Sequence, residues 1–261
     1  MTAFEALLAT RNAADYAEFL LPYLTPDARV LDAGCGNGTI TLGLAERAGH
    51  VVAVDAEDDF ADARRHASEI GLENVEFRRG SVYALELPPD HFDACLAHSL
   101  LETLARPLDA LTEIRRTLKP GGVLGVACVE YGGLILAGPE EELLRRFYSV
   151  RERLWQLDDV SPYRGRRLRG LLEQAGFEDV VAGSRFFSYG TRAAVECFGR
   201  ARAEECGDGW FSTSAREHEL ATGEELDEMR AGWLEWSKSP DAYLAFAWCR
   251  AVGRKPKPDD P

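Results

Sequence analysis

The chain has 261 residues, of which 46% are hydrophobic, so it is long enough to bury a sizeable core in one large α/β domain. Its formal net charge of −14, without a face of lysines and arginines, argues against a nucleic-acid substrate. No run approaches the roughly 18 apolar residues of a membrane span, and the first residues lack a basic and apolar leader. We therefore expect a cytoplasmic protein without membrane association.

Cysteine and histidine are spread thinly along the chain. The six cysteines show no C-x-x-C spacing, several fall in expected strands, and the five histidines are scattered. This pattern predicts buried free thiols, and neither a disulfide framework nor a metal site.

The N-terminal segment is predicted to form an amphipathic helix over 13–24, because Tyr16, Leu20 and Tyr23 recur on one face. The first expected strand follows at 28–33. It leads into the most informative stretch of the sequence.

A glycine-rich turn comes directly after this strand. Gly34, Gly36 and Gly38 alternate through it, and a helical apolar stripe then runs to Gly49. A strand, a glycine-rich turn and a helix N-terminus together bring backbone N–H groups close to a ligand.

Two carboxylates next to the turn indicate which ligand it binds. A dinucleotide turn follows G-x-G-x-x-G, but Thr39 stands here in place of the last glycine. Asp32, two residues before the first glycine, would repel a pyrophosphate and attract a cationic amino group. S-adenosyl-L-methionine (SAM) carries an ammonium and a sulfonium and no phosphate. Asp55 ends a second expected strand, 51–55, where it can accept hydrogen bonds from ribose hydroxyls.

The remaining elements alternate between helix and strand. Strands are predicted over 75–79, 92–97, 123–129, 178–189 and 242–253. Helices are predicted over 57–70 (with Phe60 and Ile70 buried), 107–118, 139–163, 168–175 and 191–206, and a further helix begins at the capping box of Thr222 and Glu225. Residues 119–122 are predicted to form a turn, and 85–90 and 207–214 to form loops.

At these motifs the sequence resembles a known family. The D-x-G-x-G-x-G motif that begins at Asp32, the acid Asp55 and the stretch Leu118-Lys119-Pro120-Gly121-Gly122 are similar to those of class I SAM-dependent methyltransferases. The most similar branch is the small-molecule type (methyltransferase type 11) that includes the quinone-biosynthesis enzymes. The resemblance covers roughly residues 10–130 with specific motifs, and 166–177 and 241–254 more loosely.

The resemblance implies an α/β fold, with a seven-stranded doubly wound (Rossmann-like) sheet in a single domain of residues 1–261 and an antiparallel last strand. Its core would comprise about 25–130, 166–190 and 241–254, and helical lid elements about 1–24, 139–163 and 190–237. The segment 139–163 has a wide apolar arc, which suits either a lid over a substrate or a dimer interface. We expect a monomer or a homodimer.

The resemblance also implies a set of residues that hold the cofactor, SAM. They are Arg11, Asp32, Ala33, Gly34, Cys35, Gly36, Asp55, Ala56, Gly80, Ser81, Val82, His98 and Ser99. Arg11 would meet the SAM carboxylate, unless it is a solvated surface charge. Ser81 stands where relatives often carry an aspartate for the adenine amino group, so that contact would come from its hydroxyl or from backbone.

The candidate catalytic residues are His98, Glu130 and Tyr131. His98 lies at the end of the strand 92–97, on the sheet edge where open α/β sheets bind ligands, and it is either a base or a wall of the pocket. Glu130 and Tyr131 are expected to emerge from the end of the strand 123–129. The candidate acceptor contacts are Tyr16, Tyr131, Tyr148, Trp155 and Tyr163. The basic run 163–169 is either a solvated helix start or a dock for an anionic group.

The predicted function is transfer of a methyl group from SAM to a small organic acceptor, giving S-adenosylhomocysteine, mainly by positioning and desolvation. One alternative is a SAM-binding regulatory or partner protein without turnover, and another is a tRNA or protein methyltransferase. A nicotinamide-dependent oxidoreductase is disfavoured by Asp32. The acceptor, and whether its O, N or C atom is methylated, stay open.

Overall fold

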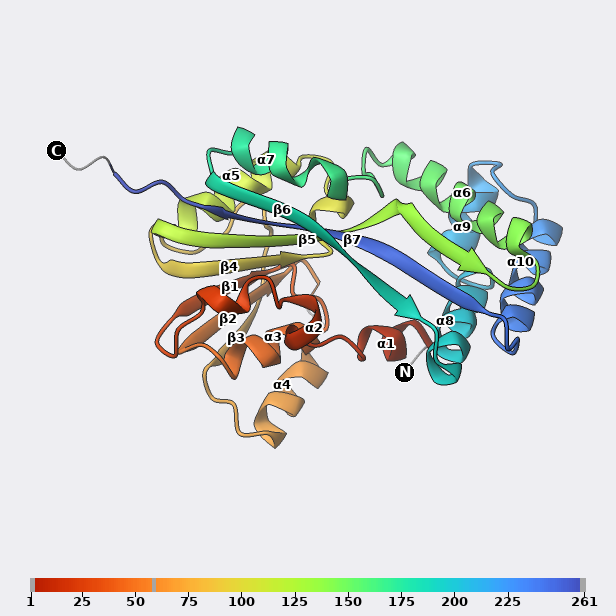
Figure 1. Cartoon of the computed structure of the whole chain (residues 1–261), viewed down its shortest axis with the longest axis horizontal. Helices are drawn as coiled ribbons and strands as arrows, with labels where there is room; N and C mark the ends of the chain where they lie inside the picture. The colour runs from red at the N-terminus through yellow and green to blue at the C-terminus, as the bar shows by residue number, and fades with distance from the viewer. Residues whose placement is uncertain (1–2, 58–59, 259–261) are drawn as a thin grey trace. The chain divides into compact units, whose positions relative to one another are not determined.

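The computed structural model of the chain describes residues 3–57 and 60–258. Within these residues lies a seven-stranded sheet of order β3-β2-β1-β4-β5-β7-β6 (Figure 1). Its strands are β1 (Arg29–Ala33), β2 (His50–Asp55), β3 (Val75–Arg79), β4 (Phe92–His98), β5 (Leu118–Ala137), β6 (Glu178–Tyr189) and β7 (Tyr243–Arg254). The predicted doubly wound α/β fold is confirmed.

The first five strands of the sheet pair in parallel. β1 lies between β2 and β4 and is parallel to both, with Leu31 opposite Val52 and Cys95. β7 runs antiparallel to β5: Gly121, early in β5, donates its N–H to the carbonyl of Lys255 at 2.8 Å, whereas the later Gly133 lies against Ala247.

The helices found in the described residues are short, except for three in the second half of the chain. They are α1 (Ala3–Leu8), α2 (Ala13–Tyr16), α3 (Thr39–Ala45), α4 (Ala61–Glu69), α5 (Pro107–Thr117), α6 (Glu141–Leu157), α7 (Leu168–Gln174), α8 (Arg192–Glu205), α9 (Trp210–Glu217) and α10 (Gly223–Trp236). Single 3₁₀ turns form η1 (Leu21–Tyr23), η2 (Leu101–Thr103) and η3 (Gly165–Arg167).

The chain divides into two compact units. The described part of unit 1 comprises 3–10, 130–162 and 186–247. The described part of unit 2 comprises 11–57, 60–129, 163–185 and 248–258. The expectation of one domain with lid elements stays a prediction.

Unit 2 has a core on each face of its strands, because successive side chains of a strand point to opposite faces. Val30 packs with Ile40 and Leu44 of α3, whereas the next residue, Leu31, packs in a second core with Leu111 of α5 and residues of α7. Figure 1 shows α5 and α7 on one face of these strands and α3 and α4 on the other. Because β1, β2 and β4 are parallel, their carboxyl ends lie at the same edge of the sheet.

Unit 1 is built mainly of helices α6, α8, α9 and α10. Its core is aromatic: the ring of Phe147 lies 4.5 Å from Phe211 and 5.6 Å from Trp233, between ring centroids. The predicted capping box is confirmed at the start of α10, where the Thr222 N–H donates to the Glu225 carboxylate at 2.9 Å.

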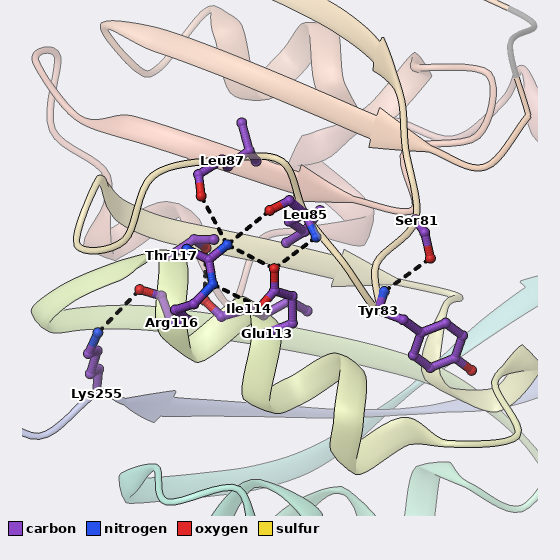
Figure 2. Close-up of polar contacts among 9 residues, drawn as sticks. All are labelled: Ser81, Tyr83, Leu85, Leu87, Glu113, Ile114, Arg116, Thr117 and Lys255. Carbon is purple, nitrogen blue, oxygen red and sulfur yellow. Dashed lines mark hydrogen bonds and ion pairs between the residues drawn. The ribbon is translucent and has the colours of Figure 1, made fainter.

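A polar clamp fixes the loop between β3 and β4 in unit 2 (Figure 2). Nη2 of Arg116, near the end of α5, donates to the carbonyls of Leu85 and Leu87, each at 2.9 Å. Glu113 accepts the Leu85 N–H at 2.8 Å. The loop therefore has a defined path, although its sequence predicts no regular structure.

Three sequence predictions were wrong in their local structure. The helix expected over 13–24 ends at Tyr16, and Pro22, which has no N–H to continue an α-helical ladder, lies in η1 instead. Ile70 is 46% exposed rather than buried, because α4 ends at Glu69. Residues 58–59 of the helix expected over 57–70 lie outside the described residues, but Phe60 is buried as predicted.

The third wrong prediction is the loop over 207–214, where α9 begins at Trp210. Although this segment is largely polar, Phe211 and Ala215 are both buried.

The turn expected at 119–122 lies within β5, where the pairing with β4 is irregular. β4 advances from Phe92 to Ala94 while β5 advances from Leu118 to Val123.

Candidate functional site

The glycine turn between β1 and α3 combines two packed glycines with one open glycine. A Cβ on Gly34 would lie 2.8 Å from the Leu100 side chain, and one on Gly38 would lie 2.8 Å from Phe77. Gly36 has a φ of +52° and no heavy atom within 4 Å of such a Cβ. At Gly36 the backbone is therefore open to a ligand, whereas the other two glycines serve the fold of the turn.

Asp55, the last residue of β2, holds this turn in place. Its Oδ2 accepts the N–H of Gly36 at 2.8 Å, and its Oδ1 accepts the N–H of Glu57 at 3.1 Å. A carboxylate has about four acceptor sites, so both oxygens can accept a further hydrogen bond from a ligand hydroxyl.

Asp32 is a buried acid beneath the turn, only 2% exposed. It accepts a hydrogen bond from the Thr41 hydroxyl of α3 at 2.6 Å, and no cation pairs with it among residues 3–57 and 60–258. Burial raises the pKa of Asp32 to about 7, against the opposing effect of the Thr41 hydrogen bond, and the nearby Asp55 raises it further. A cation placed here would stabilise the ionised form.

The segment after β3 is tied to the end of β2. Gly80 donates its N–H to the carbonyl of Asp55 at 2.8 Å, and Arg79 Nε donates to the carbonyl of Ala56 at 3.1 Å. The hydroxyl of Ser81 accepts the N–H of Tyr83 at 3.3 Å, as Figure 2 shows. This bond is local, and the predicted adenine contact at 80–82 stays a prediction.

His98 ends β4 inside an aromatic group, and it is only 6% exposed. Its ring stacks on Trp248 at 4.7 Å and 13°, and meets the Tyr16 ring edge-on at 5.4 Å. The Arg11 guanidinium lies 5.3 Å from the Trp248 ring and 5.5 Å from Tyr16, so Arg11 is part of this group.

The imidazole of His98 is neutral at neutral pH. Burial, followed by the charge of Arg11, holds the pKa of His98 well below its usual value. Nε2 of His98 is buried and has no hydrogen-bond partner among the described residues. This nitrogen is therefore available to a ligand.

Ser99 and Glu102 follow His98 and brace the ends of two strands. The Ser99 hydroxyl donates to Glu102 Oε1 at 3.1 Å, and the N–H of Val129 donates to the same oxygen at 3.2 Å. Glu102 is fully buried, and this burial raises its pKa. The S-x-x-E spacing of Ser99 and Glu102 was the signal in the sequence that could have revealed this acid.

In unit 1 the structure brings three of the predicted acceptor residues together. The ring of Tyr131 stacks with Trp155 at 5.7 Å and meets Tyr148 edge-on at 5.5 Å. Phe246 of β7, which the sequence did not single out, also stacks with Tyr131, at 5.6 Å. Tyr148 is buried, and Tyr131 is half-buried.

The other predicted residues lie elsewhere. Tyr16 and Tyr163 belong to unit 2, where Tyr163 packs under the Arg166 guanidinium at 4.9 Å. Glu130 and Tyr131 do not emerge from a strand end, because β5 continues to Ala137. Glu130 is buried and its Oε1 accepts the N–H of Gly132 at 3.0 Å.

Comparison with known proteins now decides the family. A family model described as a methyltransferase domain matches residues 31–126. An uncharacterized methyltransferase of Schizosaccharomyces pombe is 30% identical over 251 residues, which span 93% of this chain and 84% of that protein. The chain belongs to the class I SAM-dependent methyltransferases. It is an enzyme of this class, and its cofactor is SAM.

Two further similarities bear on this methyltransferase. The ubiquinone biosynthesis O-methyltransferase of Dinoroseobacter shibae is 37% identical over 114 residues, 43% of this chain and 46% of that protein. A solved structure titled as the [4+2]-cyclase SpnF has a TM-score of 0.58 and 25% identity, covering 94% of this chain and 82% of that chain. The second protein shows that this fold is used for more than one reaction.

Two general properties of the methyltransferase can be read from the described residues. No group of three or more His, Cys, Asp or Glu side chains is placed to hold a metal ion there. No helix in 3–57 or 60–258 has the length and apolar character needed to cross a membrane. Cys95, Cys128 and Cys206 are buried free thiols, as predicted, whereas Cys35, Cys197 and Cys249 are only half-buried.

Proposed function

We propose that this enzyme transfers the methyl group of SAM to a small organic acceptor. The observation that carries the proposal is the group of stacked and edge-on rings at Tyr131, Tyr148, Trp155 and Phe246. Small-molecule sites are lined mainly by apolar and aromatic side chains with a few polar groups. A net charge of −14 supports a small acceptor over a nucleic acid.

The proposed cofactor residues follow from charge and backbone geometry. The open backbone at Gly36 can approach the cofactor, and the free acceptor sites of Asp55 suit two ribose hydroxyls. Asp32 is a buried carboxylate without a cation among the described residues, which suits the ammonium group of SAM. The residues present therefore fit this cofactor.

When bound, SAM supplies an electrophilic methyl group on a sulfonium sulfur. The protein's main contribution is then to hold acceptor and methyl group in line and to exclude water, which is worth roughly 7–11 kcal/mol at best. For an acceptor with a hydroxyl group, the unprotonated Nε2 of His98 can accept a hydrogen bond from that hydroxyl and so orient it, although the lowered pKa makes His98 a weak base. The low pKa of His98 keeps it unprotonated at neutral pH.

The first test is methyl transfer from labelled SAM to a panel of phenols, indoles, amines and aromatic acids. We expect label in at least one small acceptor and release of S-adenosylhomocysteine. Label only in tRNA or protein would contradict the proposed acceptor class. Binding of SAM without label in any acceptor would contradict the transfer itself.

Site variants link the activity to the geometry. Asp55→Ala removes the acceptor of the Gly36 and Glu57 N–H groups and is expected to weaken SAM binding at least about tenfold, or about 1.4 kcal/mol. Glu57→Ala, which removes an exposed carboxylate two residues away, is the control and should bind SAM normally. His98→Asn should retain SAM affinity but lower turnover. Unchanged SAM affinity in Asp55→Ala would contradict the assignment of the turn.

A further inference from the structure

Unit 1 contains a group of buried and half-buried charged and phenolic side chains that the methyl-donor site does not use. We call it the arginine–tyrosine cluster, and its members come from β5, α6 and α8. They are Tyr131, Tyr148, Arg151, Arg202 and Glu205. The side chains of Arg151 and Arg202 are only 14% and 7% exposed.

The cluster has one positive charge in excess. Arg151 Nη1 and Arg202 Nη1 both donate to the carboxylate of Glu205. The charged groups that act on both tyrosines are these two arginines and this one acid. Burial raises the pKa of Tyr131 and Tyr148, so the phenols stay neutral and do not balance the charge.

Two donors of the cluster are buried without an acceptor. In the part of the chain that the structure describes, neither Nε of Arg151 nor the hydroxyl of Tyr148 has a hydrogen-bond partner. Native proteins rarely leave such groups unpaired, and each case calls for an explanation. A bound water could accept these hydrogen bonds, but it could not balance the excess positive charge.

The surroundings of these donors are planar and apolar. Tyr148 meets Phe147, Trp233 and Phe246 edge-on, with centroid distances of 5.3, 6.1 and 5.7 Å. The Arg151 guanidinium lies 5.8 Å from the ring of Trp155. A ligand that satisfies this cluster therefore needs an anionic group and a flat apolar body.

We propose that the arginine–tyrosine cluster binds the carboxylate of the acceptor, and that the acceptor is an aromatic or conjugated monocarboxylic acid. The identification of this ligand as the acceptor rests on the proposed function. A monoanion balances the single excess charge, and its oxygens accept from Arg151 Nε and the Tyr148 hydroxyl. A phosphate dianion would leave one uncompensated negative charge among buried aromatic rings, which is unfavourable.

Calorimetry on the full-length protein saturated with S-adenosylhomocysteine tests this proposal without turnover. The probes are 4-hydroxycinnamate, its methyl ester and phenyl phosphate. We expect the acid to bind at least tenfold more tightly than the ester or the phosphate. Equal affinity for acid and ester, preference for the phosphate, or no binding of the acid would each overturn the proposal.

Three variants assign any preference to the cluster. Tyr148→Phe removes only a hydroxyl that has no partner among residues 3–57 and 60–258, so the protein should fold normally, and its preference for the acid should fall severalfold. Arg151→Gln should abolish the preference. Arg153→Gln, an exposed arginine on the same helix, is the matched control and should bind like the wild type. A preference that survives in both cluster variants would overturn the proposal.

The same measurements separate this inference from the proposed function. Methyl transfer to the ester as fast as to the acid would leave the proposed function intact and overturn the carboxylate assignment. Tight binding of the acid without methyl transfer to any acceptor would do the opposite, since it would support the cluster as a carboxylate site and contradict the reaction.

Discussion

The glycine turn of unit 2 and the arginine–tyrosine cluster of unit 1 carry opposite electrostatic imbalances. Beneath the turn, Asp32 is a buried acid that no cation among the described residues balances. In the cluster, Arg151 and Arg202 share one acid, Glu205. One site is short of a positive charge, and the other is short of a negative charge.

The two sites can respond to this imbalance in different ways. A carboxyl group can take up a proton and lose its charge, and the pKa of Asp32, raised by burial to about 7, indicates that it does so below neutral pH. A guanidinium cannot lose its proton in a protein. Ligand binding at the turn should therefore depend on pH through Asp32, whereas the positive charges of Arg151 and Arg202 should be constant. Three predictions follow, from the largest expected effect to the smallest: the first and the last test this difference, and the second separates fold from ligand binding within the turn.

Asp32→Asn should stabilise the ligand-free protein at alkaline pH. The raised pKa of Asp32 means that its stabilising contribution is fully present below pH 3.8 and is lost as the pH rises through about 7. The asparagine is neutral throughout and can still accept from Thr41. Over this range the variant should gain up to about 4 kcal/mol of unfolding free energy relative to the wild type, at about 1.36 kcal/mol for each pKa unit.

Urea unfolding of both proteins from pH 4 to pH 8 measures this difference in unfolding free energy. The contributions of the other titrating groups cancel, because both proteins contain the same groups. The gain should be accompanied by weaker SAM binding, since the variant offers no charge to the ammonium. A difference that is independent of pH would show that Asp32 is ionised in the ligand-free protein, and the contrast between the two sites would be lost.

Gly38→Ala and Gly36→Ala should separate fold from ligand binding within the turn. Gly38 has a φ of +76°, and a Cβ there would lie 2.8 Å from Phe77 and 2.9 Å from Ala63. Strain and overpacking together should lower its unfolding free energy by about 2–4 kcal/mol. Gly36→Ala meets no atom, so it should lose only about 1–2 kcal/mol from its positive φ.

Ligand affinity should follow the opposite order. The added methyl group of Gly36→Ala occupies the space through which the ligand approaches the backbone, so SAM should bind at least about tenfold more weakly, or about 1.4 kcal/mol. Chemical unfolding and calorimetry on the two variants provide both quantities. Normal SAM affinity in Gly36→Ala would exclude this part of the turn as the cofactor contact.

The difference between the two sites also explains what the sequence could reveal. The turn is local: the strand, the three glycines and Asp32 lie within ten residues, and each leaves a conformational or electrostatic mark that can be read along the chain. The capping box of α10 and the burial of Phe60 were predicted correctly for the same reason, since each depends on neighbouring residues or on a repeating pattern.

The cluster is not local. Tyr131 and Arg202 are 71 residues apart and meet only when β5 and α8 pack in the same unit. The sequence indicated its two tyrosines, Tyr131 and Tyr148, but not its charged members. A signal was present, because Arg151 lies three residues after Tyr148 and four before Trp155, on the same helical face. Trp248, stacked on His98, left no such signal, since it is one apolar residue in an apolar strand.

SAM binding should release protons, and binding of an aromatic acid should not. This is the smallest predicted effect, and it tests most directly whether the two sites differ in their response to pH. At pH 6 most Asp32 is protonated, given its pKa of about 7, and an adjacent ammonium lowers that pKa, so binding should release close to one proton. His98 contributes nothing at this pH, because its pKa is already well below its usual value. The raised pKa values of Tyr131 and Tyr148 and the permanent charge of the arginines mean that neither the tyrosines nor the arginines of the cluster exchange a proton.

Calorimetry at pH 6 in two buffers of different ionisation enthalpy counts these protons. The release on SAM binding should disappear in Asp32→Asn and decline toward pH 8.5, where Asp32 is ionised before the ligand arrives. The aromatic acid should give the same heat in both buffers. Proton release that persists in Asp32→Asn would mean that another group senses the ammonium, and Asp32 would then be a purely structural acid that positions α3 through Thr41.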